Sequence, residues 1–409
     1  MPVRLDKVPA LASRPPRPRF LLWLGLLLLC LLLGVGGRLL FANEPLHQLP
    51  VDFWYWALGL PFLGWCALGF GRMLLHVGEQ SAADGWDEAR EEDMIRKIRQ
   101  GRRAQQVLGV SLYTSLRRTG DEPTAQLDGL LSGTSSLMTR PTALDGAPLR
   151  HTCLQGGAEE FPEDVLLRVL TQVLADLAQT LAQVPSDRPI ALLLEVDSAM
   201  AEGLMWRVWH QAWRESGIRQ STTPVEGSGL AAVDHWLDQR INDQAMLLVL
   251  AVQFALQAPE GTAEVAVGLL LGNRLTQTTL APIAYLHRPE QERAATDTDL
   301  LYATRQALDW VPLQAQAVER VWRVGIDPQR QAAVASVLMD VPMPVQSPQG
   351  VCNLDAVLGQ PGKTSPWLAI AAATQAIQGG AGPQFIFSGG DVGAELWGTV
   401  LMPVSPLST

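Results

Sequence analysis

Residues 21–37 read LLWLGLLLLCLLLGVGG, and residues 53–71 read FWYWALGLPFLGWCALGFG. They form the centres of two apolar runs, residues 20–42 and 53–76, separated by a polar bend at residues 43–52. Each run is long enough to cross a hydrocarbon layer about 30 Å thick as a helix that rises about 1.5 Å per residue. A buried helical hairpin in a water-soluble core is the alternative, but helices of that kind keep a polar stripe, which these runs lack. We therefore predict a two-span transmembrane hairpin.

Charged residues indicate how this hairpin is oriented. Lys and Arg lie before the first run and after the second, at Arg4, Lys7, Arg14, Arg17, Arg19, Arg90, Arg96, Lys97, Arg99, Arg102 and Arg103. The bend contains none, and these residues favour the cytoplasmic side. We expect both termini in the cytoplasm, the bend on the opposite side of the membrane, and Trp54, Tyr55 and Trp56 in the outer aromatic belt. The length of the first run, the lack of a small-x-small cleavage site and the second run argue against a signal peptide.

Composition narrows the classes of function. The formal net charge of −10 argues against a general nucleic-acid-binding protein. The basic cluster at residues 96–103 follows acidic residues at 84–93, which favours a solvated helix face over a lipid site. The cysteines are Cys30, Cys66, Cys153 and Cys352. They lack metal-ligand spacing, and a reducing cytoplasm disfavours disulfides, so nothing suggests a redox or zinc protein. We predict no metal and no cofactor, and our leading hypothesis assigns no catalytic residues.

The chain divides into four segments. They are a cytoplasmic basic N-terminus at residues 1–19, two transmembrane helices at 20–76, a charged stalk at 77–103 and a cytoplasmic α/β domain at 104–409. The last segment is long enough for two pseudo-repeat halves, which we place near residues 104–256 and 257–409.

The α/β prediction rests on the alternation of apolar runs with amphipathic segments. We expect strands at residues 107–116, 190–196, 246–254, 264–271, 281–287, 334–339, 385–388 and 397–402. We expect helices at residues 162–184, 202–216, 230–242, 298–307 and 365–378. Residues 117–150 read as an irregular excursion, and the last two strands as an antiparallel hairpin. The fold class is therefore a layered α/β domain behind a helical hairpin.

Residues 359–364, GQPGKT, resemble a phosphate-binding loop only superficially. That loop needs four residues between its glycines, which are too close here, and Pro361 removes a backbone N–H that a phosphate would use. We predict instead a tight turn into a helix, with Thr364 or Ser365 as the cap and Pro366 at an early helical position.

The end of the strand at residues 190–196 is a candidate catalytic site. Glu195 and Asp197 could exchange protons there, and Ser198 lies beside them, although no G-x-S-x-G elbow surrounds it. An enzyme of this kind would need a deep pocket that joins these residues to the loop at 217–229. Solvated carboxylates at a strand end are the alternative interpretation.

Other ring side chains gather on the predicted helices. His210 and His235 have no partner in a zinc-type arrangement, so we expect them on the surface or at an interface. Trp206, Trp209 and Trp213 recur at helical spacing. They form either part of the core or an exposed patch suited to a protein partner.

The order of elements from Pro162 onward resembles the thiolase fold of β-ketoacyl synthases. The most similar parts are MLLVLAVQF at residues 246–254, followed by EVAVGLLL, and the segment 354–377 before a Gly-rich hairpin. The resemblance implies a nucleophilic Cys between residues 196 and 230, where none occurs, and catalytic His residues after residue 288, where none occurs either. Gln360 and Pro361 lie near the place of the family's late His or Asn. The resemblance therefore implies the fold without the chemistry.

The chain also resembles the type VI lipase adaptor proteins, which combine an N-terminal membrane segment with a large cytoplasmic domain. The matching parts are the hydrophobic start, ALLLEVDSAMAEGLMWRVW at residues 191–209 and NLDAVLGQPGKTSPWLAIAAATQAI at residues 353–377. The resemblance implies a non-enzymatic adaptor that binds a phospholipase effector and helps load it on a VgrG-type spike of a type VI secretion system. Two alternatives stay open: a membrane-tethered enzyme at the strand end, and a structural subunit whose spans form the interface.

Overall fold

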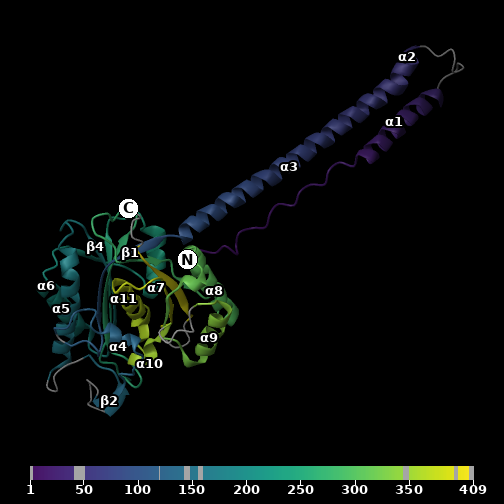
Figure 1. The fold of residues 1–409 in the computed structure, drawn as a ribbon. Coiled ribbons are helices and arrows are strands. Elements are labelled where there is room, and N and C mark those ends of the chain that lie inside the picture. Colours follow the sequence, from purple (N-terminus) through teal and green to yellow (C-terminus); the bar gives the residue numbers. More distant parts are fainter. Residues whose placement is uncertain are drawn as a thin grey trace. The chain divides into compact units, whose positions relative to one another are not determined.

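The computed structural model describes residues 3–40, 51–118, 120–141, 148–154, 160–343, 350–390 and 395–404. The chain forms two compact units, one of residues 4–98 and one that contains residues 99–409. Figure 1 shows the first as long helices and the second as a sheet with helices. Most of the predicted bend at 43–52 lies outside the described residues.

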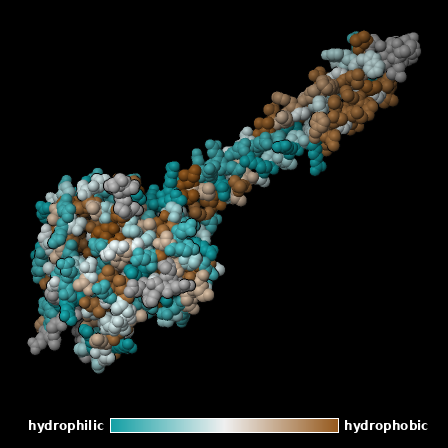
Figure 2. Space-filling view, in the orientation of Figure 1, coloured by the Kyte–Doolittle hydropathy of each residue, from teal (hydrophilic) through white to brown (hydrophobic). Residues whose placement is uncertain are grey.

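The first unit contains the predicted spans. Its elements are α1 (Phe20–Leu40), α2 (Val51–Trp54), the π-helical turn η2 (Tyr55–Gly59) and α3 (Leu60–Gly101). The second span and the stalk, predicted as separate segments, form one continuous helix, because no proline follows Pro61 before α3 ends. Both apolar stretches are long and apolar enough to cross a membrane, and each contains an 18-residue window in which no residue is buried. Apolar side chains therefore face outward along the hairpin (Figure 2), unlike those of a helix in a soluble core.

The two helices of the hairpin pack closely where Gly34 of α1 contacts the irregular turn before Pro61. Pro61 has no N–H to donate to the carbonyl of Ala57, and the π-helical turn lies directly before it. Gly34 of α1 lies against this carbonyl, since a Cβ at Gly34 would be only 2.3 Å from the Ala57 oxygen. Further along, Trp65 Nε1 donates a hydrogen bond of 2.9 Å to the carbonyl of Trp23.

The second unit, which we call the α/β domain, is built on one large sheet. The strands in chain order are β1 (Ala104–Tyr113), β4 (Ile190–Asp197), β5 (Thr222–Pro224), β6 (Met246–Gln253), β7 (Val265–Asn273), β8 (Ala284–His287), β9 (Glu290–Gln291), β10 (Arg320–Val324), β11 (Val351–Asn353), β12 (Gln384–Ser388) and β13 (Trp397–Pro403). They lie in the order β11-β10-β12-β13-β8-β1-β7-β6-β4-β5, with β9 beside β13. A separate ribbon, β2 (Met138–Pro141) with β3 (Pro148–His151), lies in the stretch predicted to be irregular.

The sheet consists of two halves with the same topology. The order β5-β4-β6-β7-β1 is repeated as β11-β10-β12-β13-β8, with two parallel and then two antiparallel pairings in each half. An antiparallel pairing of β1 with β8 joins the halves. In chain order, the first half therefore ends with β7 at residue 273 and the second half begins with β8 at residue 284. The sequence indicated a boundary near residue 256, but that point falls between β6 and β7, which pair as an antiparallel hairpin within the first half.

The helices form layers around the two half-sheets. They are α4 (Leu127–Leu131), α5 (Pro162–Leu181), α6 (Glu202–Glu215), α7 (Gly229–Gln239), α8 (Asp297–Trp310), α9 (Gln331–Asp340), α10 (Leu354–Leu358) and α11 (Ser365–Gln378). One apolar cluster joins α5 and α6 to the first half, and another joins α8 and α9 to the second. A third lies between the halves and contains α7 and α11.

One predicted strand is a helix. Residues 334–339 lie within α9, and its buried residues are Ala333, Val334, Val337 and Leu338. This pairing of buried positions every four residues is helical periodicity, which a six-residue apolar window conceals.

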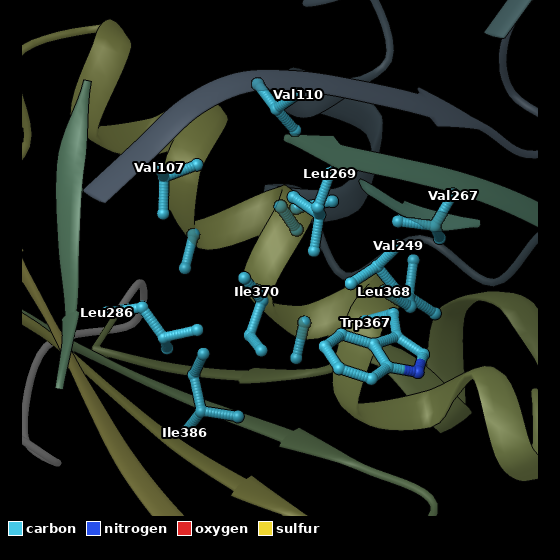
Figure 3. Packing of buried hydrophobic residues seen from close by; sticks show 14 of the residues in the cluster. Val107, Val110, Val249, Val267, Leu269, Leu286, Trp367, Leu368, Ile370 and Ile386 are labelled. Atoms are coloured by element: carbon cyan, nitrogen blue, oxygen red, sulfur yellow. The ribbon is translucent and has the colours of Figure 1, made fainter. Parts of the chain in front are cut away.

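Helix α11 is the centre of the core. Every residue from Ser365 to Ile377 is buried. Figure 3 shows Trp367, Leu368 and Ile370 packed among side chains from both halves of the sheet. A helix that is apolar on all sides is stable only when it is enclosed in this way.

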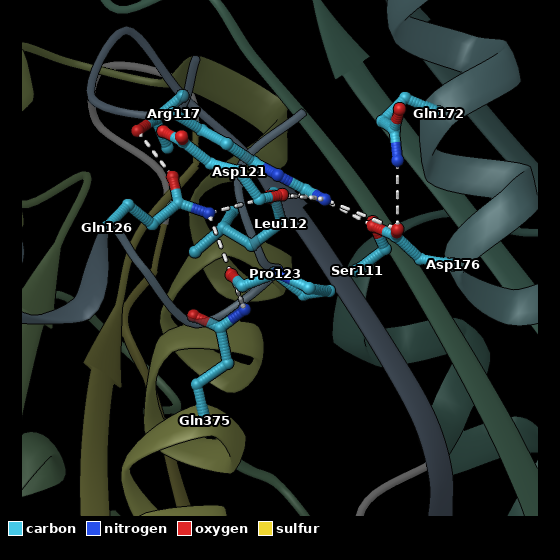
Figure 4. Close-up of polar contacts among 10 residues, drawn as sticks. Ser111, Leu112, Arg117, Asp121, Pro123, Gln126, Gln172, Asp176 and Gln375 are labelled. Carbon is cyan, nitrogen blue, oxygen red and sulfur yellow. Dashed lines mark hydrogen bonds and ion pairs between the residues drawn. The ribbon is translucent and has the colours of Figure 1, made fainter. Parts of the chain in front are cut away.

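A buried ion pair fastens β1 to α5 (Figure 4). Arg117 Nη1 donates to Asp176 Oδ2 at 2.7 Å, and the two side chains are 1% and 9% exposed. Ser111 Oγ and Gln172 Nε2 also donate to this carboxylate, and Arg117 donates to the Leu112 carbonyl. Both charges are therefore compensated without water.

We expect Asp176→Ala to destabilise the α/β domain by about 3–5 kcal/mol, because it leaves the Arg117 charge buried without a partner. Urea unfolding of the full chain in detergent, followed by tryptophan fluorescence, measures this difference. Asp187→Ala is the matched control, since Asp187 is exposed. Equal unfolding midpoints for the two variants would contradict the assignment. The double variant Arg117→Met with Asp176→Leu should recover part of the loss.

Candidate functional site

A cavity of about 500 Å³ opens at the carboxyl ends of β4 and β6. These parallel strands end level with each other, with Asp197 opposite Gln253. Glu195 and Asp197 line the cavity together with residues 227–229, as the enzyme hypothesis predicted, and the second half of the sheet contributes Gly389, Gly390 and Glu395. Ser198 does not line it. The structure thus brings two of the three candidate residues to the end of the 217–229 loop.

Glu195 is held in place by both of its carboxylate oxygens. The backbone N–H of Gly229, the first residue of α7, donates to Oε1, and Trp367 Nε1 of α11 donates to Oε2 at 2.8 Å. Burial raises the pKa of Glu195 above its usual range, while these hydrogen bonds and the nearby Lys363 charge act in the opposite direction. The carboxylate therefore ties β4 to the starts of two central helices.

The turn before α11 forms another wall, through Lys363 and Thr364. Gln253 Nε2 donates to the carbonyls of Gln360 and Ala263, at 2.9 Å each, and so fixes the turn to β6. Thr364 occupies the cap position and Pro366 lies in the first turn, as predicted, but the Thr364 hydroxyl donates to the Pro361 carbonyl instead of accepting from the helix. The side-chain cap prediction is wrong, because a 3₁₀ turn precedes α11 and brings that carbonyl within reach.

The lining of this cavity determines the chemistry that it supports. Its charged residues are Glu195, Asp197, Glu395 and Lys363, and its hydroxyls are those of Ser228 and Thr364. Among the described lining residues there is neither a thiol nor an imidazole. Within the part of the chain that the structure describes, no three His, Cys, Asp or Glu side chains gather as metal ligands.

A second, mostly apolar cavity of about 360 Å³ adjoins the first and shares Leu194, Val196 and Val252 with it. Ser198 lines this one, beside Trp206 and Trp209. The tryptophan cluster therefore has two environments: Trp209 is 5% exposed and belongs to the core, whereas Trp206 is 45% exposed.

The structure also places the two predicted histidines and two methionines that the sequence analysis did not name. The His210 ring stacks on Trp206 with centroids 5.8 Å apart, and both His210 and His235 are exposed, as predicted. Met200 and Met205 also line the apolar cavity, although the sequence analysis did not single them out. Met205 lies four residues before Trp209 on α6, and this helical spacing could have indicated it, whereas Met200 precedes the helix and carries no such signal.

Comparisons with solved structures place the α/β domain in a known fold. The ishigamide ketosynthase/chain length factor gives a TM-score of 0.52 at 16% identity, over 74% of this chain and 100% of that chain. The oxazolomycin ketosynthase domain OzmH KS7 of Streptomyces albus JA3453 gives 0.51 at 11% identity, over 75% and 76%. Human mitochondrial 3-ketoacyl-CoA thiolase gives 0.48 at 9% identity, over 75% and 99%. No protein-family profile and no curated protein sequence matches the chain.

The chain has a thiolase/ketosynthase-like fold, and the predicted fold class is confirmed. At such low identities the likeness extends to the fold alone, because one fold can carry many unrelated functions.

We expect Glu195→Ala to destabilise the α/β domain by about 2–4 kcal/mol, because Gly229 N and Trp367 Nε1 each lose a buried acceptor. Urea unfolding of the full chain measures this. Asp197→Ala is the control: it lines the same cavity but accepts no side-chain hydrogen bond from a described residue.

The same variant tests the raised pKa of Glu195. A carboxyl group with a raised pKa holds its proton longer in the folded state, so its stabilisation is complete at low pH and declines as pH rises through the raised value. The advantage of the wild type over Glu195→Ala should therefore be larger at pH 5 than at pH 8. An advantage that grows with pH would show that the hydrogen bonds outweigh burial.

Proposed function

We propose that this protein is a non-enzymatic, membrane-anchored adaptor whose α/β domain binds another protein. The observation that carries the proposal is the pairing of an anchor-like hairpin with a ketosynthase-like fold, in which the described residues that line the cavity beside α11 include no thiol and no imidazole. The hairpin spans the bacterial inner membrane, with both termini in the cytoplasm, in accordance with the positions of Lys and Arg along the chain.

The partner in this proposal is a phospholipase effector, delivered to a VgrG-type spike of a type VI secretion system. This part rests on the resemblance of residues 191–209 and 353–377 to the type VI lipase adaptors. The first of these segments supplies most of the lining of the apolar cavity, including Val196 and Trp206. An exposed tryptophan beside an open apolar cavity is the kind of surface that anchors a protein partner.

Two other functions compete with the adaptor. In a tethered enzyme, Glu195 or Asp197 would have to act with Ser198, which lies in the neighbouring cavity, and Glu195 is already engaged by two hydrogen bonds. In a structural subunit of a membrane complex, the spans themselves would be the interface. Exchanging the hairpin for an unrelated two-span hairpin separates this function from the adaptor, which would keep its activity.

We expect the full-length protein in detergent to co-purify with the phospholipase effector encoded beside its own gene. Trp206→Ala should weaken the complex by about tenfold or more, because a partly exposed tryptophan is a typical binding hot spot. Met339→Ala is the matched control, since Met339 is 85% exposed on α9, in the other half of the domain. Biolayer interferometry with the immobilised effector gives the affinities. Absence of binding to that effector, or equal weakening by both variants, would overturn the proposal.

A further inference from the structure

A third cavity, of about 340 Å³, lies within the hairpin between α1 and α3. Its walls are almost entirely apolar and include Trp23, Leu27 and Trp65. Its size falls within the range of ligand pockets, roughly 300–1,000 Å³. We call it the hairpin groove.

One end of the hairpin groove is marked by positive charge. Arg72 lines it beside Pro18 and Phe20, where α1 begins. Arg17 and Arg19 flank Pro18 in the chain. The other end, at Leu27, lies about two turns further into the apolar part of α1. The groove therefore leads from a basic rim into the part of the hairpin that faces hydrocarbon.

The guanidinium of Arg72 has unused hydrogen-bonding capacity. Its nearest carboxylate is that of Glu79, at 3.8 Å from Nη1, and the Glu79 side chain is 54% exposed. Arg72 donates no side-chain hydrogen bond to any described residue. Arginine presents its donors in a fixed fork that matches a phosphate oxygen pair, so a phosphate at the rim would satisfy them.

We propose that the hairpin groove binds one anionic phospholipid of the cytoplasmic leaflet, with its phosphate at Arg72 and an acyl chain along Trp23 and Trp65. The inference rests on the membrane insertion in the proposed function. In a bilayer, an apolar groove that is open to the side is filled by hydrocarbon rather than water. The basic rim selects an anionic headgroup over a zwitterionic one.

Two glycines of α3 supply a matched pair of variants. Gly69 lines the groove, and a Cβ there would meet no atom within 4 Å, so a leucine side chain extends into the groove without moving the backbone. Gly71 also has no atom within 4 Å of a Cβ, but it does not line the groove. It lies roughly 200° further around the helix. Both variants replace glycine by leucine in the same apolar helix, so they differ only in whether the new side chain fills the hairpin groove.

The experiment uses the full-length protein, delipidated in detergent and titrated with phosphatidylglycerol or phosphatidylcholine of identical acyl chains, with native mass spectrometry as the readout. We expect one bound phosphatidylglycerol and a preference over phosphatidylcholine of at least about fivefold. Gly69→Leu should reduce occupancy about tenfold, whereas Gly71→Leu should leave it unchanged. Arg72→Gln should abolish the preference between the two lipids, and Arg72→Lys should keep it.

Three results would overturn the inference: no preference in the wild type, equal occupancy in both glycine variants, or a protein dimer that Gly69→Leu abolishes. Alkaline extraction of membranes distinguishes failure of the lipid-site proposal from failure of the membrane-anchor proposal. A protein that stays in the membrane but shows no lipid preference refutes the lipid site alone. A protein that alkali releases without detergent refutes the anchor itself.

Discussion

The fold depends on the complete burial of α11. A helix with no exposed face needs apolar partners on all sides, and here they come from strands of both half-sheets, such as Val249 and Ile386. Two half-sheets of the same topology, joined by the pairing of β1 with β8, provide that enclosure. The five alanines of α11, at 369, 371–373 and 376, let the surrounding elements approach closely. Polar side chains of α11 donate both within the helix and beyond it: Thr374 Oγ1 donates to the Ile370 carbonyl at 2.7 Å, and Gln375 Nε2 donates to the Pro123 carbonyl at 2.7 Å.

The same constraint explains the character of the cavity beside α11. Glu195 is partly buried there, and its oxygens hold the first residue of α7 and the indole of Trp367. Such a carboxylate supports the core, and moving it to serve chemistry would leave the buried Trp367 indole and the partly buried Gly229 N–H without acceptors. Asp197 and Lys363 line the same cavity.

The sequence was informative where structure depends on local pattern. The two long apolar helices, the buried strands β4 and β6 and the helix α11 follow from run length and periodicity, and the structure confirms these elements. Long-range pairing is different. Nothing local reveals that β1 pairs with both β7 and β8, that Arg117 meets Asp176, or that Ser198 faces a different cavity from Glu195. A change of register or of sheet order leaves the local apolar pattern intact, so the sequence cannot distinguish these arrangements.

The membrane insertion that we propose would place the hairpin under a different balance of forces from the α/β domain. In lipid the hydrophobic effect gives two helices no drive to associate, so close packing and hydrogen bonds have to hold them together. Gly34 supplies the first by meeting the Ala57 carbonyl, to which Pro61 cannot donate, and Trp65 supplies the second by donating to Trp23. Because the Trp65 indole turns toward α1 and Gly69 has no side chain, the helices leave a space one turn further on. The contact of Trp65 with α1 therefore holds the two helices together and also leaves the hairpin groove beside Gly69, one turn further along α3.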